Sequence, residues 1–121
     1  MNNINPTSLI SFNGLIVKGT VPQKSVKTLG DFASRFENIN FINDLEQNFE
    51  VDAVLNSDIT KMTFSHKKYG SLLDYGCSWY PLENVFRDIT TVIGDMKSAM
   101  KKAKKDFEKN IAEKELIKRG C

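Results

Sequence analysis

The sequence predicts an α+β fold: a small antiparallel sheet, made of an N-terminal hairpin and two further strands, packed by one short helix and a long C-terminal helix with a heptad pattern. Three observations lead to this fold class. Apolar and polar residues alternate in short runs, as they do in half-buried strands. After the first two runs, apolar residues recur every three or four positions, as on one face of a helix. The same helical period returns, longer and more regular, after residue 81.

Length and composition indicate one domain. The chain has 121 residues, of which 40% are hydrophobic, close to the usual values for a single globular domain. We expect residues 1–121 to form a single domain, with an α+β body over 1–80 and a long amphipathic helix with a basic tail over 81–121. No run of eighteen apolar residues and no signal-peptide pattern is found, so a cytoplasmic protein without membrane insertion is expected.

The first two strands are expected to pair as a hairpin. Two apolar, β-branched runs, residues 8–12 and 15–21, are separated by Asn13-Gly14. This dipeptide tolerates the positive φ angles of a two-residue hairpin turn. Pro22 has no amide hydrogen to give to a sheet, so it should end the second strand.

A short helix is expected from Ser25 to Phe36, because Val26, Leu29, Phe32, Ala33 and Phe36 share one helical face. Ser25 suits its N-cap, and residues 38–40 suit its end. Residues 41–49 fit a short helix and a loop equally well.

Two further strands are expected over residues 50–56 and 59–65, joined by the turn residues Asn56-Ser57-Asp58. In the first, Val51, Ala53 and Leu55 alternate with polar residues. In the second, Thr60, Met62 and Phe64 alternate in the same way, with Ile59 on the polar face. Both patterns predict half-buried antiparallel strands.

The segment 66–80 has no clear period. Long loops in compact domains often carry function, and aromatic rings are favoured at the centre of protein interfaces. Two interpretations stay open: the rings bind a partner, or they close the core over the start of the long helix. The candidate partner-binding residues are Tyr69, Tyr75, Trp79 and Tyr80.

The C-terminal helix has the clearest pattern. From Leu82 to Phe107, apolar residues step by four and three positions in turn, which is a heptad seam. A helix of about 30 residues is about 45 Å long, whereas strands of five to seven residues span only about 17 to 23 Å. The seam should therefore extend past the sheet and support self-association. The candidate residues are Ile93, Met96, Met100, Ala103 and Phe107.

A basic cluster lies on the same helix. Residues 101–121 carry eight basic and four acidic side chains, against nine and eleven in the first 100 residues. Acidic residues at i,i+4 from the lysines are typical of a solvated helix face, so nucleic-acid binding is the less favoured interpretation. The candidate phosphate contacts are Lys101, Lys102, Lys104 and Lys105.

Residues for catalysis or metal binding are few. The chain has one histidine, His66, and two cysteines, Cys77 and Cys121, without zinc-ligand spacing or a nucleophile motif. The run from Gly14 to Thr20 lacks the lysine of a phosphate-binding loop. We therefore expect no enzyme activity, no metal and no cofactor.

One family resemblance is present. Residues 14–65, with the runs L-I-V-K-G-T-V, S-V-K-T-L-G-D-F-A-S-R-F-E-N, F-I-N-D-L-E-Q-N-F and I-T-K-M-T-F-S, resemble the soluble ferredoxin-like domain of the PilN family of type IV pilus assembly proteins. The resemblance implies a scaffold that pairs with sister domains and catalyses nothing.

The function expected from these observations is that of a non-catalytic protein–protein interaction or assembly protein. It would bind a protein partner of unknown identity and form a homo-oligomer through the C-terminal helix. The alternatives are a nucleic-acid-binding module that uses the lysine-rich helix, and a small phage or mobile-element protein that binds and inhibits a host machine.

Overall fold

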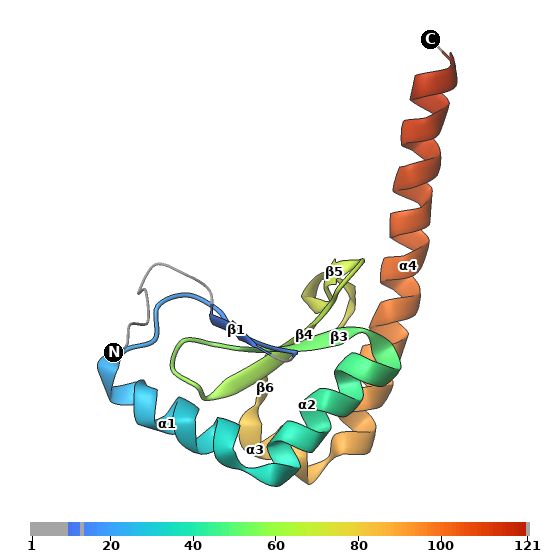
Figure 1. The fold of residues 1–121 in the computed structure, drawn as a ribbon. Helices are drawn as coiled ribbons and strands as arrows, with labels where there is room; N and C mark the ends of the chain where they lie inside the picture. Colours follow the sequence, from blue (N-terminus) through green and yellow to red (C-terminus); the bar gives the residue numbers. More distant parts are fainter. Residues whose placement is uncertain (1–9, 13, 121) are drawn as a thin grey trace.

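The structure is a computed structural model that describes residues 10–12 and 14–120, with side chains for residues 14–114. Its element order confirms the α+β class (Figure 1). The elements are β1 (Ile10–Phe12), β2 (Leu15–Val17), α1 (Gln23–Ser34), α2 (Phe36–Phe49), β3 (Val51–Leu55), β4 (Lys61–His66), β5 (Gly70–Ser71), the 3₁₀ turn η1 (Leu73–Tyr75), β6 (Tyr80–Pro81), α3 (Leu82–Arg87) and α4 (Ile89–Gly120).

The sheet is mixed, which corrects the expected antiparallel arrangement. β1 and β2 form the expected hairpin, with Phe12 opposite Leu15 and Gly14 at φ 86°, although residues 8, 9 and 13 of the expected hairpin lie outside the described residues. β2 and β3 pair in parallel, because α1 and α2 carry the chain back before β3 begins. β4 returns antiparallel to β3, and its other edge pairs with β5 and β6.

The helical region between β2 and β3 is longer than expected. α1 begins after Pro22 rather than at Ser25, whose side chain is buried. Residues 41–49 are helical, and Asn38 lies inside α2 instead of ending α1. Its Nδ2 atom donates to the carbonyl oxygen of Phe32 at 3.0 Å, so it satisfies a backbone acceptor near the end of the preceding helix. Phe36, expected on the apolar face, is 78% exposed.

One face of the sheet forms the core with the helices. α1, α2 and α3 lie on that side of the sheet, and α4 begins beside them (Figure 1). The alternating positions predicted for the strands are buried as expected, with the exception of Thr60, which is exposed. The buried apolar residues of the strands are Leu15, Val17, Val51, Ala53, Val54, Leu55, Met62 and Phe64.

The turn before β4 differs from the alternation expected there. Ile59, assigned to the polar face, is 2% exposed and has φ 58°. Asn56 holds the turn, because its Oδ1 atom accepts hydrogen bonds from the backbone amides of Thr60 and Lys61, both at 2.9 Å. The turn therefore places Ile59 in the core at a backbone conformation that β-branched residues rarely adopt.

The C-terminal helix is interrupted at Asp88, where φ is −138° and ψ is 60°. Asp88 Oδ1 accepts a hydrogen bond from the amide of Thr91 at 3.4 Å and so acts as a cap for the start of α4. The expected single helix is therefore two helices, because a local cap can interrupt a helix without changing the spacing of its apolar residues.

Most of the heptad seam is buried in the body. Met96 and Ala103 are 0% and 1% exposed, and Met100 and Phe107 are half-buried. The seam is expected to extend past the sheet, and in the structure Ala103 is buried and Met100 and Phe107 are half-buried at this point of α4. The body reaches further than the strands alone, because the segment 66–80 also packs against α4.

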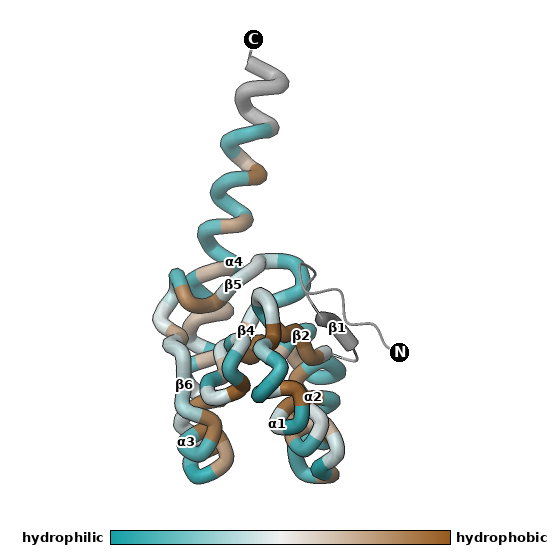
Figure 2. The backbone as a smooth tube through the Cα atoms, turned by 90° about the vertical axis from the view of Figure 1, so that its left-hand side faces the viewer, coloured by the Kyte–Doolittle hydropathy of each residue, from teal (hydrophilic) through white to brown (hydrophobic). Residues whose placement is uncertain are grey.

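Beyond Phe107, α4 projects away from the body (Figure 1). The side chains of residues 108–114 are all exposed. Figure 2 shows that this projecting part is mostly hydrophilic, with isolated hydrophobic positions. Ile111, in this part of the helix, is 43% exposed. In the described part of the chain, no helix combines the length and the apolar character needed to cross a membrane.

Candidate functional site

Three of the four nominated aromatic residues contact α4. The hydroxyl of Tyr75 donates to Asp106 Oδ2 at 2.6 Å, and the hydroxyl of Tyr80 donates to Asp95 Oδ2 at 2.9 Å. The ring of Tyr69 lies 5.3 Å from that of Phe107, centroid to centroid. We call Tyr69, Tyr75 and Tyr80 the tyrosine clamp. These contacts correspond to the second interpretation of the segment, in which its rings close over the long helix.

Trp79 lies elsewhere, against the sheet face that the helices leave open. It lines a hollow of ≈ 200 Å³ together with Ile16, Val54, Thr63 and Leu73. Ile16 is paired with Val54, and Val54 with Thr63, so these three residues form a line across three strands. Trp79 therefore lines a hollow on the sheet, whereas its neighbour in the chain, Tyr80, contacts α4.

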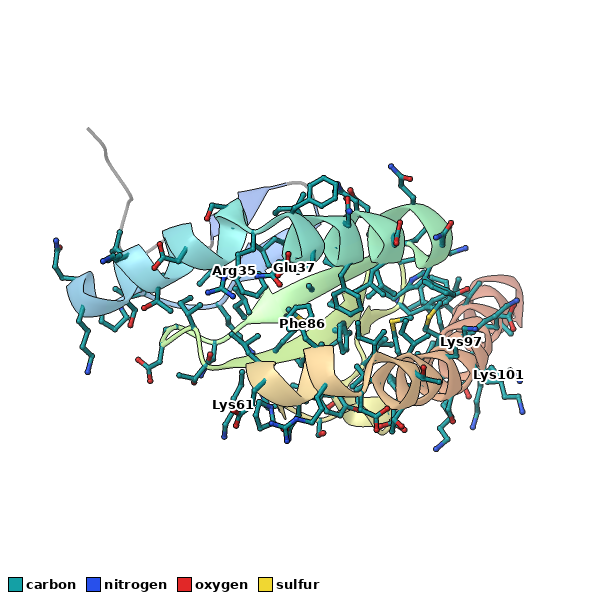
Figure 3. All side chains as sticks on the ribbon, turned by 90° about the horizontal axis from the view of Figure 1, so that it is seen from below. Arg35, Glu37, Lys61, Phe86, Lys97 and Lys101 are labelled. Atoms are coloured by element: carbon teal, nitrogen blue, oxygen red, sulfur yellow. The ribbon has the colours of Figure 1, made fainter. Side chains whose placement is uncertain are left out.

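A larger hollow, of ≈ 450 Å³, lies between the end of α2 and the middle of α4. Three lysines of α4, at spacings of four and three residues, line one wall. Figure 3 shows two of them, Lys97 and Lys101, on α4. We call this hollow the lysine groove. Its lining residues are Asn48, Phe49, Glu50, His66, Tyr69, Lys97, Met100, Lys101 and Lys104.

The aromatic rings of the lysine groove already contact other side chains of the chain. Tyr69 stacks on His66 with 4.2 Å between ring centroids and 13° between planes, and it also contacts Phe107. Lys97 Nζ lies 5.5 Å from the centroid of Phe49. Such a contact between a cation and a ring holds the lysine beside the groove.

The opposite wall of the groove is acidic. Glu50 ends α2 with φ 56°, and its amide donates to the carbonyl oxygen of Glu46 at 3.1 Å. Nearby, Lys67 Nζ pairs with Glu46 and Asp52 at 3.0 and 2.8 Å. Within the described residues, Glu50 forms no comparable ion pair. The groove thus has lysines on one side and the Glu50 carboxylate with a helix C-terminus on the other.

His66 stabilises the turn below the groove. Its Nδ1 atom accepts hydrogen bonds from the amides of Lys68 and Tyr69, at 3.0 and 3.2 Å. Burial lowers the pKa of His66, an effect that Glu50 partly opposes. The ring is therefore a neutral acceptor at neutral pH, with its remaining proton on Nε2.

Cys77 is in a different environment. It is buried, and burial raises the pKa of its thiol to about 11. Burial also raises the pKa of the neighbouring Tyr80 to about 12, with a further contribution from its hydrogen bond to Asp95. In the part of the chain that the structure describes, no hydrogen bond joins Cys77 to His66. The two residues therefore do not form a nucleophile–base pair there.

The nominated lysine cluster does not form one surface. Lys101 and Lys104 line the lysine groove, whereas Lys102 Nζ lies next to Gly76, on the η1 side of α4. Lys105 is exposed. Sequence reasoning missed Lys97, although its spacing of four and seven residues from Lys101 and Lys104 could have indicated a shared helical face.

A third hollow, also ≈ 450 Å³, lies where α1 and α2 meet α3. Arg35 and Glu37 come from the α1–α2 junction and Phe86 from α3 (Figure 3). Its charged lining residues are three acidic ones, Asp31, Glu37 and Glu83, and one basic one, Arg35, so the hollow is acidic on balance.

The described residues contain no group of three or more His, Cys, Asp or Glu side chains placed to hold a metal ion. Comparisons with family models, with curated proteins and with solved structures found no match. The resemblance to the PilN family therefore stays an expectation.

Proposed function

We propose that this chain is a non-catalytic interaction or assembly protein, and that the projecting part of α4 is its docking element. A second copy of the chain is the first candidate partner. The observation that carries the proposal is that α4 continues past Phe107 while the side chains of residues 108–114 are all exposed.

The physical argument concerns the stability of such a helix. A short helical segment in water gains little from its own hydrogen bonds, and most helical stability in proteins comes from packing. The body anchors α4 firmly as far as Ala103, and Tyr75 extends this anchorage to Asp106. A rigidly oriented segment without packing of its own is a suitable surface for a partner helix.

Ile111 is the best single contact candidate on this segment. Its side chain is 43% exposed and follows the half-buried Phe107 at a spacing of four residues. Pairing between copies would cover both residues. The seam residues nominated from the sequence would then support self-association indirectly, because Met96 and Ala103 fix the direction of α4 from inside the core.

Light scattering during size-exclusion chromatography tests the proposal on the full chain. Ile111→Glu should lower the oligomeric mass, or raise the concentration at which the oligomer forms, without a change in melting temperature. Ala112→Glu is the matched control, because this neighbouring exposed residue gains the same charge one position along the helix. A native protein that stays monomeric at high concentration would exclude self-association, and a partner of another kind would then need to be found.

Nucleic-acid binding has less support. The nominated lysines lie on different sides of α4, and three acidic residues, Asp106, Glu108 and Glu113, follow them along the helix. A phosphate-binding surface gains affinity from many lysines that act together.

A further inference from the structure

We propose that the lysine groove binds an acidic amphipathic helix of a partner protein. This surface is distinct from the projecting part of α4. The inference rests on the proposed interaction role and names the chemical class of one partner. It begins from the asymmetry of the groove, in which three lysines face a wall that carries a carboxylate.

The lysines have the repeat of a helix face. Lys97, Lys101 and Lys104 occupy positions i, i+4 and i+7, so they follow one side of α4 over about 10 Å. A partner helix that packs along α4 presents its own side chains with the same period. Acidic residues at matching positions would each meet a lysine, as in the charged flanks of paired helices.

The floor of the groove suits the apolar side of such a helix. Phe49, Tyr69 and Met100 are half-buried and line the hollow between the two walls. Methionine adapts its shape to different apolar neighbours, so Met100 can accommodate a partner side chain. An amphipathic helix would place its acidic stripe on the lysine wall and its apolar stripe on this floor.

The acidic wall disfavours a uniform polyanion. Glu50 and the carbonyl end of α2 form the side of the groove opposite the lysines. A helix C-terminus carries partial negative charge, so phosphates in the groove would be repelled from that side. A peptide helix avoids this repulsion, because it can carry a neutral or basic residue towards Glu50 and acidic residues towards the lysines.

The rings in the groove also disfavour single-stranded nucleic acid. Sequence-tolerant binding of single strands depends on bases that stack on open aromatic faces. Here His66 covers one face of Tyr69, Phe107 approaches its ring, and Lys97 lies over the ring of Phe49. The faces of these rings are therefore not open as a stacking platform for bases.

The test uses a designed probe and the full chain. The probe is a fluorescent peptide of about 18 residues, about five helical turns, with Glu at i, i+4 and i+7 beside a leucine stripe. A second peptide has the same composition in shuffled order, and a short DNA duplex and a single strand serve as polyanions. Binding is measured by fluorescence anisotropy at about 0.1 M salt, where exposed charges still interact over about 10 Å.

Charge reversal at two lysines tests whether the peptide binds in the lysine groove. Lys97→Glu with Lys104→Glu should weaken binding of the amphipathic peptide by about tenfold or more, which corresponds to about 1.4 kcal/mol. Lys102→Glu with Lys109→Glu is the matched control. It makes the same charge change at the same spacing of seven residues, with Lys102 on the Gly76 side of α4. This control should bind the peptide within about twofold of the native chain.

Three results would overturn the inference: equal loss in the two double variants, equal binding of the shuffled peptide, or tighter binding of either DNA than of the peptide. Absence of any binding by the native chain would overturn it too. Each variant is first checked for an unchanged melting temperature. Lys97→Glu removes the contact between Lys97 and Phe49 and could unfold the protein. In that case Lys101→Glu alone replaces the double variant. The self-association test at Ile111 is read from mass, so the two proposals can fail separately.

Discussion

The hydroxyl of Tyr75 donates a hydrogen bond to Asp106, with 2.6 Å between the two oxygen atoms, and thereby ties the 3₁₀ turn η1 to α4 near the point where that helix leaves the body. The two residues are 31 positions apart in the chain. A hydrogen bond to a carboxylate is stronger than one between neutral groups. This contact therefore helps to anchor α4 as far as Asp106.

Loss of this bond should loosen α4 locally. We predict that Tyr75→Phe increases amide hydrogen exchange between residues 100 and 107, while β3 and β4 keep their protection. Asp106→Ala should give the same pattern, and the double variant should add little, because both changes remove one contact. Glu108→Ala is the control, since this exposed acidic residue has no hydrogen bond in the described structure that involves its side chain. Unchanged exchange in Tyr75→Phe would contradict the prediction.

Local patterns predicted most elements but not their connections. The alternation of Val51, Ala53 and Leu55 placed β3 within a residue at each end, because strand burial has a period of two. The direction of β3 relative to β2 could not be predicted, since it depends on how α1 and α2 return the chain. Residues 41–49 fit a helix and a loop equally well by their sequence pattern, so the pattern alone does not indicate a helical crossover.

Prediction of the candidate site from the sequence is limited for a similar reason. The heptad spacing identified the buried face of α4, yet Asp88 interrupts the helix without disturbing that spacing. The bonds from Tyr75 to Asp106 and from Tyr80 to Asp95 link residues far apart in sequence, so no local pattern indicates them. The sequence pattern could indicate only one wall of the lysine groove, through the spacing of Lys97, Lys101 and Lys104.

His66 should make stability depend on pH. Burial lowers its pKa below the ordinary value of 6.5, so the unfolded chain binds a proton at His66 at a higher pH than the folded chain does. The free energy of unfolding is therefore highest above about pH 6.5 and falls as the pH drops towards the folded pKa. Urea unfolding at a series of pH values measures this fall.

His66→Asn is the informative variant for this prediction. An amide oxygen can still accept from the amides of Lys68 and Tyr69, but the residue no longer titrates. The difference in stability between the native chain and this variant should shrink or change sign as the pH is lowered from 7.5 to 5, since His66 is the one histidine of the chain. A stability difference that stays constant with pH would contradict a lowered pKa of His66.

Cys77 should be unreactive in the folded chain. Its thiol is buried and has a pKa raised to about 11, and the thiolate is the form that reacts with alkylating agents. In a Cys121→Ser background, iodoacetamide at pH 8 should modify the native protein far more slowly than the urea-unfolded protein, as followed by mass spectrometry. Equal rates in the two states would show that Cys77 is accessible and would reopen the question of a reactive thiol.

The last prediction concerns two threonines, Thr63 in β4 and Thr60 just before it. One is buried and the other is exposed. Thr63 is 2% exposed, and its hydroxyl oxygen has no hydrogen-bond partner within the described residues. Thr60 is exposed, and its hydroxyl oxygen accepts from Asn56 Nδ2 at 2.9 Å. A buried polar group without a partner destabilises the fold, whereas an intact hydrogen bond typically contributes about 0.5–1.5 kcal/mol.

Valine replaces threonine with nearly the same shape and removes the hydroxyl in both cases. Thr63→Val should therefore leave the free energy of unfolding unchanged or raise it by up to about 1 kcal/mol. Thr60→Val should lower it by about 0.5–1 kcal/mol, because Asn56 then loses one of the contacts that hold the turn around Ile59. The midpoint of urea unfolding measures both changes at an unchanged slope. A loss in Thr63→Val as large as that in Thr60→Val would mean that the Thr63 hydroxyl has a stabilising partner after all, on the open sheet face beside Trp79.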